Sequence, residues 1–214
     1  QRDIVEAGSR PVIYWIDNTI HAELQARIAI FQRNIKAMHY SDHVHEKGGI
    51  WLARKLVQRP IFKLEQKFMS ERILSRPHTH FNSMRRFAQA MRGNKAVFSM
   101  NNAFLGRRHT CTPISDELCF IQATAPLNMA RKYNALIVPV TALEAKPFEH
   151  YTVQFHEPLE ADMSLSRDDD FRRMAYLSTA RQLKLIKNHP DQYLCFVGDQ
   201  LDMPENGRIK RYGM

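Results

Sequence analysis

The sequence predicts an α/β fold in which a central, largely parallel or mixed sheet is flanked by helices. Short apolar runs typical of buried strands alternate along the chain with longer segments of helical periodicity. The resulting order of one strand, three helices, one strand, one helix, two strands and one helix is typical of α/β domains. The 214 residues suffice for one domain, which we place over residues 1–198, followed by a polar tail over residues 199–214.

Four segments are predicted to form strands. Residues 11–16 make an unbroken apolar run, as a strand buried on both faces does. Residues 95–100 and 136–140 are similar runs, whereas residues 151–155 alternate apolar and polar side chains and indicate a half-buried strand. Ligands of parallel α/β sheets bind beyond the carboxyl ends of the strands, so the loops after the first two strands are the expected place for a site.

Helices are predicted from apolar spacing and from the residues at their ends. Asp17, Asn18 and Thr19 are types that cap helices, and apolar side chains recur at helical spacing after them. Near the C-terminus, three aspartates open a helix and lysines close it, as the helix dipole favours. The predicted helices cover residues 19–38, 63–75, 79–93, 126–133 and 168–188, and the predicted loops include the His-rich segment 39–48 and residues 101–109.

Cysteine content and hydropathy limit the class of protein. Cys111, Cys119 and Cys195 are an odd number without a CxxC pair, so we expect no disulfide framework, no four-cysteine zinc site and a reducing compartment. No apolar run of about 18 residues occurs, so we expect no segment that spans a bilayer, and there is no secretory signal. Because the sequence starts at Gln1 rather than Met, we expect an N-terminal segment to be missing.

The chain is basic, with a formal net charge of +9 and a pI near 9.6. Such a surface attracts nucleic acid, anionic lipid headgroups or an acidic carrier protein. The basic residues occur as scattered pairs, such as Arg85-Arg86 and Arg172-Arg173, which a solvated surface also explains. No helix-turn-helix, RNP or zinc-finger pattern is present, so we expect no nucleic acid partner.

The loop after the first strand offers a candidate catalytic pair, Asn18 and Glu23. With Asn18 capping the helix, its side chain and that of Glu23 can meet in the first turns. A histidine at position 18 would be a base held by a carboxylate, the arrangement that activates a hydroxyl nucleophile. Asparagine cannot accept a proton, and a plain helix cap is the simpler interpretation of Asn18.

The loop after the second strand offers candidate substrate-binding residues. Asn101 and Asn102 stand at its start, and Arg107 and Arg108 follow, whose guanidinium groups suit a phosphate. A solvated loop is the alternative. Thr124 lies in a turn of small residues that opens a helix, where a ligand can approach the backbone closely.

Histidines cluster in the first half of the chain. His39, Asp42, His43, His45 and Glu46 lie close together, but their spacing matches no zinc motif. A His-x-His pair lies nearby at residues 78–80, but it does not complete a known zinc motif with them. We therefore expect no metal site and no cofactor, and a histidine acting as a general base is more plausible than a metal ligand.

Five sequence blocks occur in the order and spacing of a known family. They are the Gly/Arg segment 106–114, the small-residue turn 123–126, the Met-Ala-Arg block 129–131, the Val-Pro block 134–139 and the Pro-Asp-Gln-Tyr segment within 188–194. Together they resemble the bacterial lysophospholipid acyltransferase superfamily, in its lipid A late (lauroyl/myristoyl) acyltransferase branch. The resemblance covers about residues 11–195 and implies a glycerolipid acyltransferase-like fold.

The resemblance implies transfer of a fatty acyl chain from a thioester donor, on acyl carrier protein or CoA, to a glycolipid or lysolipid acceptor. It implies peripheral contact with the cytoplasmic face of the bacterial inner membrane, with Arg107 and Arg108 holding a phosphate. The family's His-x4-Asp/Glu motif falls on Asn18 and Glu23, so the carboxylate is present and the histidine is replaced. The family's acidic and His residues after the second strand are replaced by Asn101 and Asn102, and its Trp-x-His-x-Arg segment by residues 195–199.

Another histidine must therefore supply the base, and His45 and His21 are the candidates. His21 lies on the same helix as Glu23 and is expected to point away from the strand ends, whereas the loop of His45 can reach back over them. We expect His45 to be the base, with Glu23 or Asp42 orienting it, in a cleft that continues into an apolar groove for the acyl chain. The alternative is a catalytically inactive acyltransferase-fold protein that binds lipid or acyl carrier as a subunit.

Overall fold

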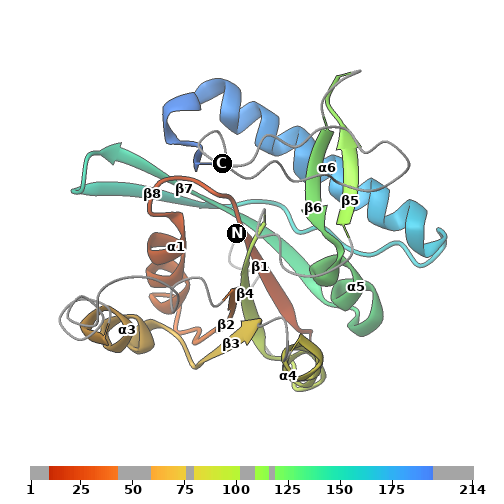
Figure 1. Cartoon of the computed structure of the whole chain (residues 1–214), viewed down its shortest axis with the longest axis horizontal. Helices are drawn as coiled ribbons and strands as arrows, with labels where there is room; N and C mark the ends of the chain where they lie inside the picture. Colours follow the sequence, from red (N-terminus) through yellow and green to blue (C-terminus); the bar gives the residue numbers. More distant parts are fainter. Residues whose placement is uncertain (1–9, 43–58, 76–79, 102–108, 116–118, 195–214) are drawn as a thin grey trace.

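A six-stranded sheet forms the centre of the molecule (Figure 1). The structure is a computed structural model and describes residues 10–42, 59–75, 80–101, 109–115 and 119–194. The strand order is β3-β2-β4-β1-β7-β8, and every pair is parallel except the antiparallel pair β7–β8. The predicted α/β class with a largely parallel, mixed sheet is therefore confirmed. The strands are β1 (Val12–Ile16), β2 (Met38–Asp42), β3 (Glu71–Ser75), β4 (Ala96–Met100), β7 (Leu136–Lys146) and β8 (His150–Phe155).

Helices cover both faces of the sheet. Helix α1 (Ala22–Phe31) packs on one face, against alternate side chains of β1, β4 and β7 such as Tyr14, Phe98 and Val138. The intervening side chains, such as Trp15 and Ile137, point to the other face and pack against three helices. These helices are α4 (His80–Arg92), α5 (Thr124–Tyr133) and α6 (Arg167–Asn188).

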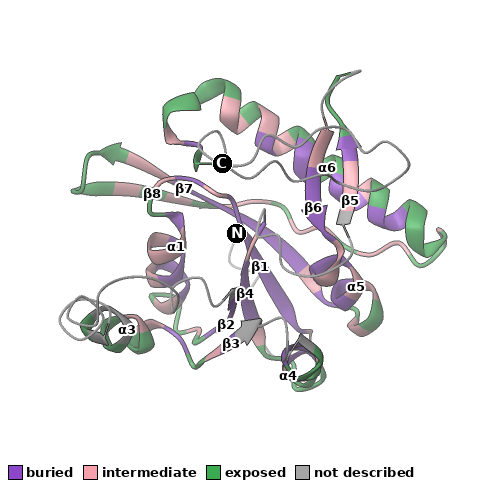
Figure 2. Cartoon of the chain, viewed as in Figure 1, coloured by how far each residue is buried: buried purple, intermediate pink, exposed green. Residues whose placement is uncertain are grey.

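The predicted strand over residues 11–16 is confirmed as β1, which lies between β4 and β7. All five of its residues are buried, which explains why its sequence is apolar at every position and does not alternate (Figure 2). Helices α4 and α6 and strands β4 and β8 also lie where the sequence predicts them. Helix α5 begins at Thr124, two residues before the predicted start, and β7 continues past residue 140 to Lys146.

The predicted loop at residues 39–48 is wrong over its first part, because residues 38–42 form β2 between β3 and β4. His39 and Tyr40 are 1% and 2% exposed. They point to opposite faces of the sheet, where His39 contacts the ring of Phe98 and Tyr40 joins the core. The strand was not predicted because it contains polar residues. The hydropathy of a segment does not show that neighbouring strands enclose it on both sides.

Two predicted helices are shorter than the sequence suggested. Helix α1 ends at Phe31, and Asn34 then adopts a positive φ of 61°, which turns the chain into β2. The helix predicted over residues 63–75 is replaced by α3 (Arg59–Glu65), the short 3₁₀ helix η4 (Gln66–Phe68) and the edge strand β3. The sequence also gave no sign of a separate two-stranded hairpin formed by β5 (His109–Pro113) and β6 (Cys119–Ala123).

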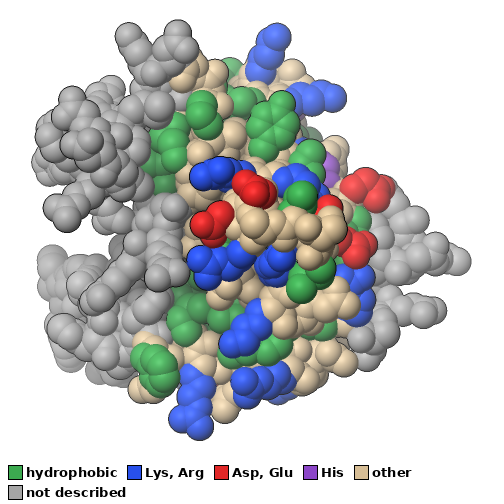
Figure 3. All heavy atoms as spheres, turned by 90° about the vertical axis from the view of Figure 1, so that its right-hand side faces the viewer, with side chains coloured by type: hydrophobic (Ala, Val, Ile, Leu, Met, Phe, Trp, Pro, Cys, Tyr) green, Lys and Arg blue, Asp and Glu red, His purple; other side chains and the backbone are tan. Residues whose placement is uncertain are grey.

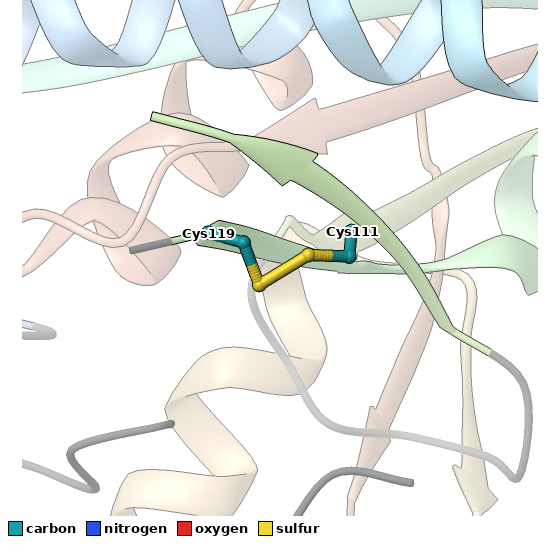
Figure 4. The surroundings of a disulfide bond; sticks show 2 residues. All are labelled: Cys111 and Cys119. Carbon is teal, nitrogen blue, oxygen red and sulfur yellow. A yellow bond between two sulfur atoms is a disulfide. The ribbon is translucent and has the colours of Figure 1, made fainter. Parts of the chain in front are cut away.

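A disulfide joins β5 to β6. It links Cys111 to Cys119, with the two Cα atoms 5.8 Å apart (Figure 4). The sequence predicts no disulfide framework, and this single bridge was not expected from it. Antiparallel pairing of β5 with β6 brings together two cysteines of a set whose odd number suggested no pairing. Cys195 and the predicted polar tail lie outside the described residues.

Within the described ranges, no helix combines the length and apolar character needed to cross a membrane. Helix α6 is long, with 22 residues, but charged side chains occur along its whole length.

Candidate functional site

Polar side chains gather at the carboxyl ends of β1, β4 and β7. Asp17 directly follows β1, Asn101 directly follows β4, and Thr141 lies on β7 one position past the end of its pairing with β1. The backbone N–H of Asn101 donates to the carbonyl oxygen of Ile16 at 2.7 Å, which joins the two strand ends. This is the edge at which ligands of α/β sheets bind.

Asp17 is fully buried and forms the centre of this cluster. Arg181 of α6 donates to both of its carboxylate oxygens, with Nη2 2.6 Å from Oδ1. Gln182 Nε2 donates to Oδ1 at 2.9 Å, and the Thr141 hydroxyl donates to Oδ2. A buried charge requires such compensation, and a bidentate guanidinium supplies it with a fixed geometry.

His156, which follows β8 directly, extends the cluster toward the surface. Its Nε2 lies 2.8 Å from Thr141 Oγ1, and this oxygen also accepts from Arg181 at 2.9 Å. Because the only hydrogen of the Thr141 hydroxyl goes to Asp17, His156 must donate from Nε2, which leaves its lone pair on Nδ1. Burial and the nearby Arg181 charge lower the pKa of His156, while Asp17 opposes them, so the ring is neutral at pH 7 and able to accept a proton.

A second group of buried amides adjoins this cluster. Asn101 Nδ2 donates to Ser178 Oγ of α6 at 3.0 Å, and Gln122 of β6 donates to Ser178 Oγ at 3.0 Å and to Asn101 Oδ1 at 3.1 Å. All three side chains are at most 1% exposed. These bonds tie α6 and the β5–β6 hairpin to the end of β4.

Glu23 belongs to a different cluster, on the face of the sheet that α1 covers. Its Oε1 accepts from Arg27 Nη2 at 2.5 Å and lies 3.5 Å from His39 Nε2. Arg27 is 3% exposed at its side chain and also approaches Glu65 Oε1 at 3.4 Å, and Glu65 in turn pairs with Arg72 at 2.5 Å. Three guanidinium or imidazole groups and two carboxylates thus connect α1 to β2, β3 and α3.

His39 is therefore the histidine that the structure places beside Glu23, and the sequence had assigned it to a loop. Arg27 Nη2 lies 3.4 Å from His39 Nδ1, and a guanidinium can only donate, so Nδ1 accepts and Nε2 faces Glu23 with its hydrogen. Nδ1 then accepts from Arg27, and Nε2 lies 3.5 Å from the Glu23 carboxylate. In this tautomer the lone pair of the ring, on Nδ1, is directed at Arg27 and not at a substrate.

The other predicted catalytic residues of this region, His21 and Asn18, contact the β7–β8 hairpin and the chain near residue 194. His21 is exposed at the start of α1, with φ of 55°, and its Nδ1 lies 3.0 Å from the hydroxyl of Tyr151 in the β7–β8 hairpin. Asn18 is half-buried, and its carbonyl oxygen accepts from the N–H of Leu194 at 3.0 Å. His21 thus contacts the β7–β8 hairpin, and Asn18 lies on a segment joined by this hydrogen bond to the chain near residue 194.

Of the predicted substrate-binding residues, Asn101 is enclosed in the buried amide group, and Thr124 is half-buried at the first position of α5. His45, Asn102, Arg107 and Arg108 lie outside the described residues. In the part of the chain that the structure describes, no three His, Cys, Asp or Glu side chains are placed to hold a metal ion.

Sequence reasoning missed Asp17, Thr141, His156 and Arg181 as site residues. Asp17 was interpreted as a helix cap, although a carboxylate directly after a fully apolar strand was a signal that it follows a buried end. The other three carried no local signal, because each occurs among ordinary polar neighbours. Their association depends on the position of α6 and β8 in space.

Charge on the described surface is mixed. On the side of the molecule that carries α5 and one end of α6, Lys and Arg side chains are spread over the surface and lie among acidic and apolar ones (Figure 3). Several are paired, such as Arg167 with Asp168 and Arg172 with Asp169. The basic side chains on this face are therefore dispersed among other side chains and do not form one patch.

Comparison with known proteins identifies the family. A search of curated proteins finds no significant match. A family model, that of the bacterial lipid A biosynthesis acyltransferases, matches residues 56–198, which include α6, the β5–β6 hairpin and most of the sheet. The match covers more than half of the chain, in agreement with the resemblance found in the sequence, and the chain therefore belongs to the bacterial lipid A biosynthesis acyltransferase family.

Proposed function

We propose that this protein transfers a fatty acyl chain from a thioester, on acyl carrier protein or CoA, to a glycolipid or lysolipid acceptor at the cytoplasmic face of the bacterial inner membrane. The family match carries the proposal, because membership implies acyl transfer to a lipid A precursor. The polar cluster at the carboxyl ends of the strands supports it, since it supplies proton-accepting and hydrogen-bonding groups where a substrate of this fold would bind.

The reaction itself defines what the site must do. The acceptor oxygen attacks the thioester carbonyl carbon, a C–O bond forms, and the C–S bond breaks. The proton of the acceptor hydroxyl passes to a base and then to the leaving thiolate. A base with a lone pair directed at the substrate is therefore needed, and Asn18 cannot provide one.

Three histidines are candidates for this role. His45 is the base proposed from the sequence, with Glu23 or Asp42 as its orienting carboxylate and His21 as the less favoured choice. His156 is the alternative that the structure adds, because the hydrogen bond of its Nε2 to Thr141 leaves the lone pair on Nδ1. Within the described ranges, no hydrogen bond involves Nδ1 of His156.

Binding of the substrates is proposed for the loop after β4 and the start of α5. Arg107 and Arg108 would hold a phosphate of the acceptor or of the phosphopantetheine arm of the donor, and Asn102 and Thr124 would line the same region. Asn101 is itself enclosed and would act by holding the end of β4 in place. The net charge of +9 favours an acidic carrier protein and an anionic membrane surface.

A catalytically inactive protein that binds lipid or acyl carrier as a subunit is the second candidate. The observation that favours it is Asn18, which stands where the family motif has its histidine. The neighbouring His39 does not replace that histidine, because its Nδ1 accepts from Arg27 and its Nε2 faces Glu23.

Thiol release from lauroyl-CoA and from lauroyl-acyl carrier protein, with and without a lipid A precursor, tests the proposal. Release that depends on the acceptor supports acyl transfer. Comparing His45→Ala, His156→Ala and His21→Ala then identifies the base, whose removal is expected to lower kcat by about 10²–10⁴-fold. The control is His150→Ala, an exposed residue of β8. No release by the unmodified protein, with release by Asn18→His, would instead support the inactive subunit.

A further inference from the structure

The β7–β8 hairpin projects beyond the edge of the sheet where the site lies. Val140 of β7 pairs with Ile16, the last residue of β1, and β7 continues for a further six residues to Lys146. At about 3.3 Å per residue, this extension reaches about 20 Å past the end of β1. Figure 1 shows the hairpin extending past α1, and its tip is among the exposed parts of the chain in Figure 2.

The tip of the hairpin, residues 146–150, is held by specific hydrogen bonds. The backbone N–H of Phe148 and the hydroxyl of Tyr151 donate to the same oxygen of Glu144, at 2.7 Å and 2.8 Å. The side chain of Gln192 binds the backbone of Glu144. Its Oε1 accepts from the Glu144 N–H at 2.8 Å, and its Nε2 donates to the Glu144 carbonyl oxygen at 2.9 Å. The orientation of the tip is thus fixed by the body of the protein.

Phe148, at this tip, is not a residue type that the stability of the hairpin favours. Its side chain is 81% exposed, and its φ of 60° is a conformation in which glycine or asparagine is preferred. The ring of His21 is its one aromatic neighbour in the described part of the chain, with the centroids 5.5 Å apart. A large apolar side chain is therefore held outward in a strained turn, with little packing to account for it.

We propose that Phe148 inserts into the boundary between lipid headgroups and acyl chains, so that the β7–β8 hairpin docks the carboxyl-end edge of the sheet onto a membrane. This inference rests on the proposed function, because an enzyme that acts on lipid acceptors needs its site close to the bilayer. The net charge of +9 attracts the protein as a whole to anionic lipids, while at the tip itself Lys146 is paired with Glu149. A bilayer fits better than a protein partner, because the described tip is narrow and offers one large apolar side chain.

Tryptophan substitution provides a direct test with a matched control. Phe81 of α4 is 80% exposed, nearly the same as Phe148, and lies well away from the hairpin (Figure 1). Phe148→Trp and Phe81→Trp are compared on vesicles of phosphatidylglycerol and phosphatidylethanolamine, after subtraction of the signal from Trp15 and Trp51. Emission from Phe148→Trp is expected to shift to the blue and to be quenched by brominated acyl chains, whereas emission from Phe81→Trp stays unchanged.

Binding measurements complete the test. Phe148→Ala is expected to weaken vesicle binding by about tenfold, as loss of one buried aromatic side chain implies, and Phe148→Leu to restore most of it. Phe81→Ala is expected to bind as the unmodified protein does. Unshifted emission from Phe148→Trp on bound vesicles, or equal binding by Phe148→Ala, overturns the proposal. Acyl transfer to detergent-dispersed acceptor by Phe148→Ala is measured separately, so that failure of the proposed function and failure of the membrane contact are distinguished.

Discussion

Asp17 and Arg181 lie 164 residues apart in the sequence, and their side chains form a bidentate ion pair at the carboxyl end of β1. Asp17 is completely buried, and Arg181 is 18% exposed at its side chain. The pair fixes α6 over the end of the sheet and so positions Thr141 and His156, which depend on the same hydrogen bonds. Stability and the geometry of the candidate site are therefore coupled through this contact.

Arg181→Ala is expected to lower the free energy of unfolding by about 3–5 kcal/mol, because it leaves the buried Asp17 carboxylate without a counter-charge. Urea unfolding followed by circular dichroism measures this. Arg172→Ala is the control on the same helix, since Arg172 is 75% exposed at its side chain, and it is expected to change stability by less than about 0.5 kcal/mol. Equal effects of the two substitutions would contradict the importance assigned to the pair.

His156 is expected to make stability depend on pH. Its pKa in the folded protein is lowered from 6.5, so the unfolded chain takes up a proton at a higher pH than the folded one. The stability that the neutral ring contributes is present above pH 6.5 and is lost as the pH falls below that value. Thermal unfolding over this range should show a larger loss of Tm for the unmodified protein than for His156→Gln.

An NMR titration of His156 checks the same point directly. Its midpoint is expected below 6.5, and its neutral form should carry the hydrogen on Nε2. A midpoint above 6.5 would contradict the lowered pKa of His156, and a hydrogen on Nδ1 would show that the hydrogen bond to Thr141 has the opposite direction from the one inferred.

Thiol labelling of the denatured protein is expected to modify one cysteine before reduction and three afterwards, because Cys111 and Cys119 are joined. Cys119→Ala should lower the free energy of unfolding by about 2–3 kcal/mol, the value for closing a loop of this length. Cys195→Ala serves as the control and should leave stability nearly unchanged. Three reactive thiols in unreduced protein would disprove the bond.

Phe148→Gly is expected to separate stability from membrane binding. Glycine adopts the positive φ at this position without strain, so Tm should stay equal or rise slightly, while vesicle binding weakens as in Phe148→Ala. Differential scanning calorimetry and vesicle sedimentation measure the two quantities. A fall in Tm of several degrees would indicate that the ring serves the packing of the hairpin instead.

The sequence predicted those strands and helices whose own residues carry the signal for that structure. Strand β1 is apolar throughout because it is enclosed on both sides, and α6 carries its aspartates and lysines at the ends that the helix dipole favours. Strand β2 was not predicted because it contains the polar His39, which is buried beside Arg27 and Glu23 of another element. Polar side chains in a buried strand resemble a loop until their partners are known.

The strand-end rule predicts a site at the ends of β1 and β4, and that location stays a prediction. Polar side chains do gather at these strand ends, and Asn101 is among them. Asp17, Thr141 and His156 meet only because β8 returns beside β7 and α6 crosses above them. The spacing of residues within one segment cannot predict a contact between distant segments. The contact of Glu23 with His39 was not predicted for the same reason.

Mass spectrometry of the lipid acceptor tests the central claim most directly. The unmodified protein is incubated with a lipid A precursor and either lauroyl-acyl carrier protein or lauroyl-CoA, beside a sample without protein. Acyl transfer predicts a product heavier by one lauroyl group, formed only when protein, donor and acceptor are all present. An acceptor of unchanged mass with both donors, from protein that is folded and binds the donor, would contradict it.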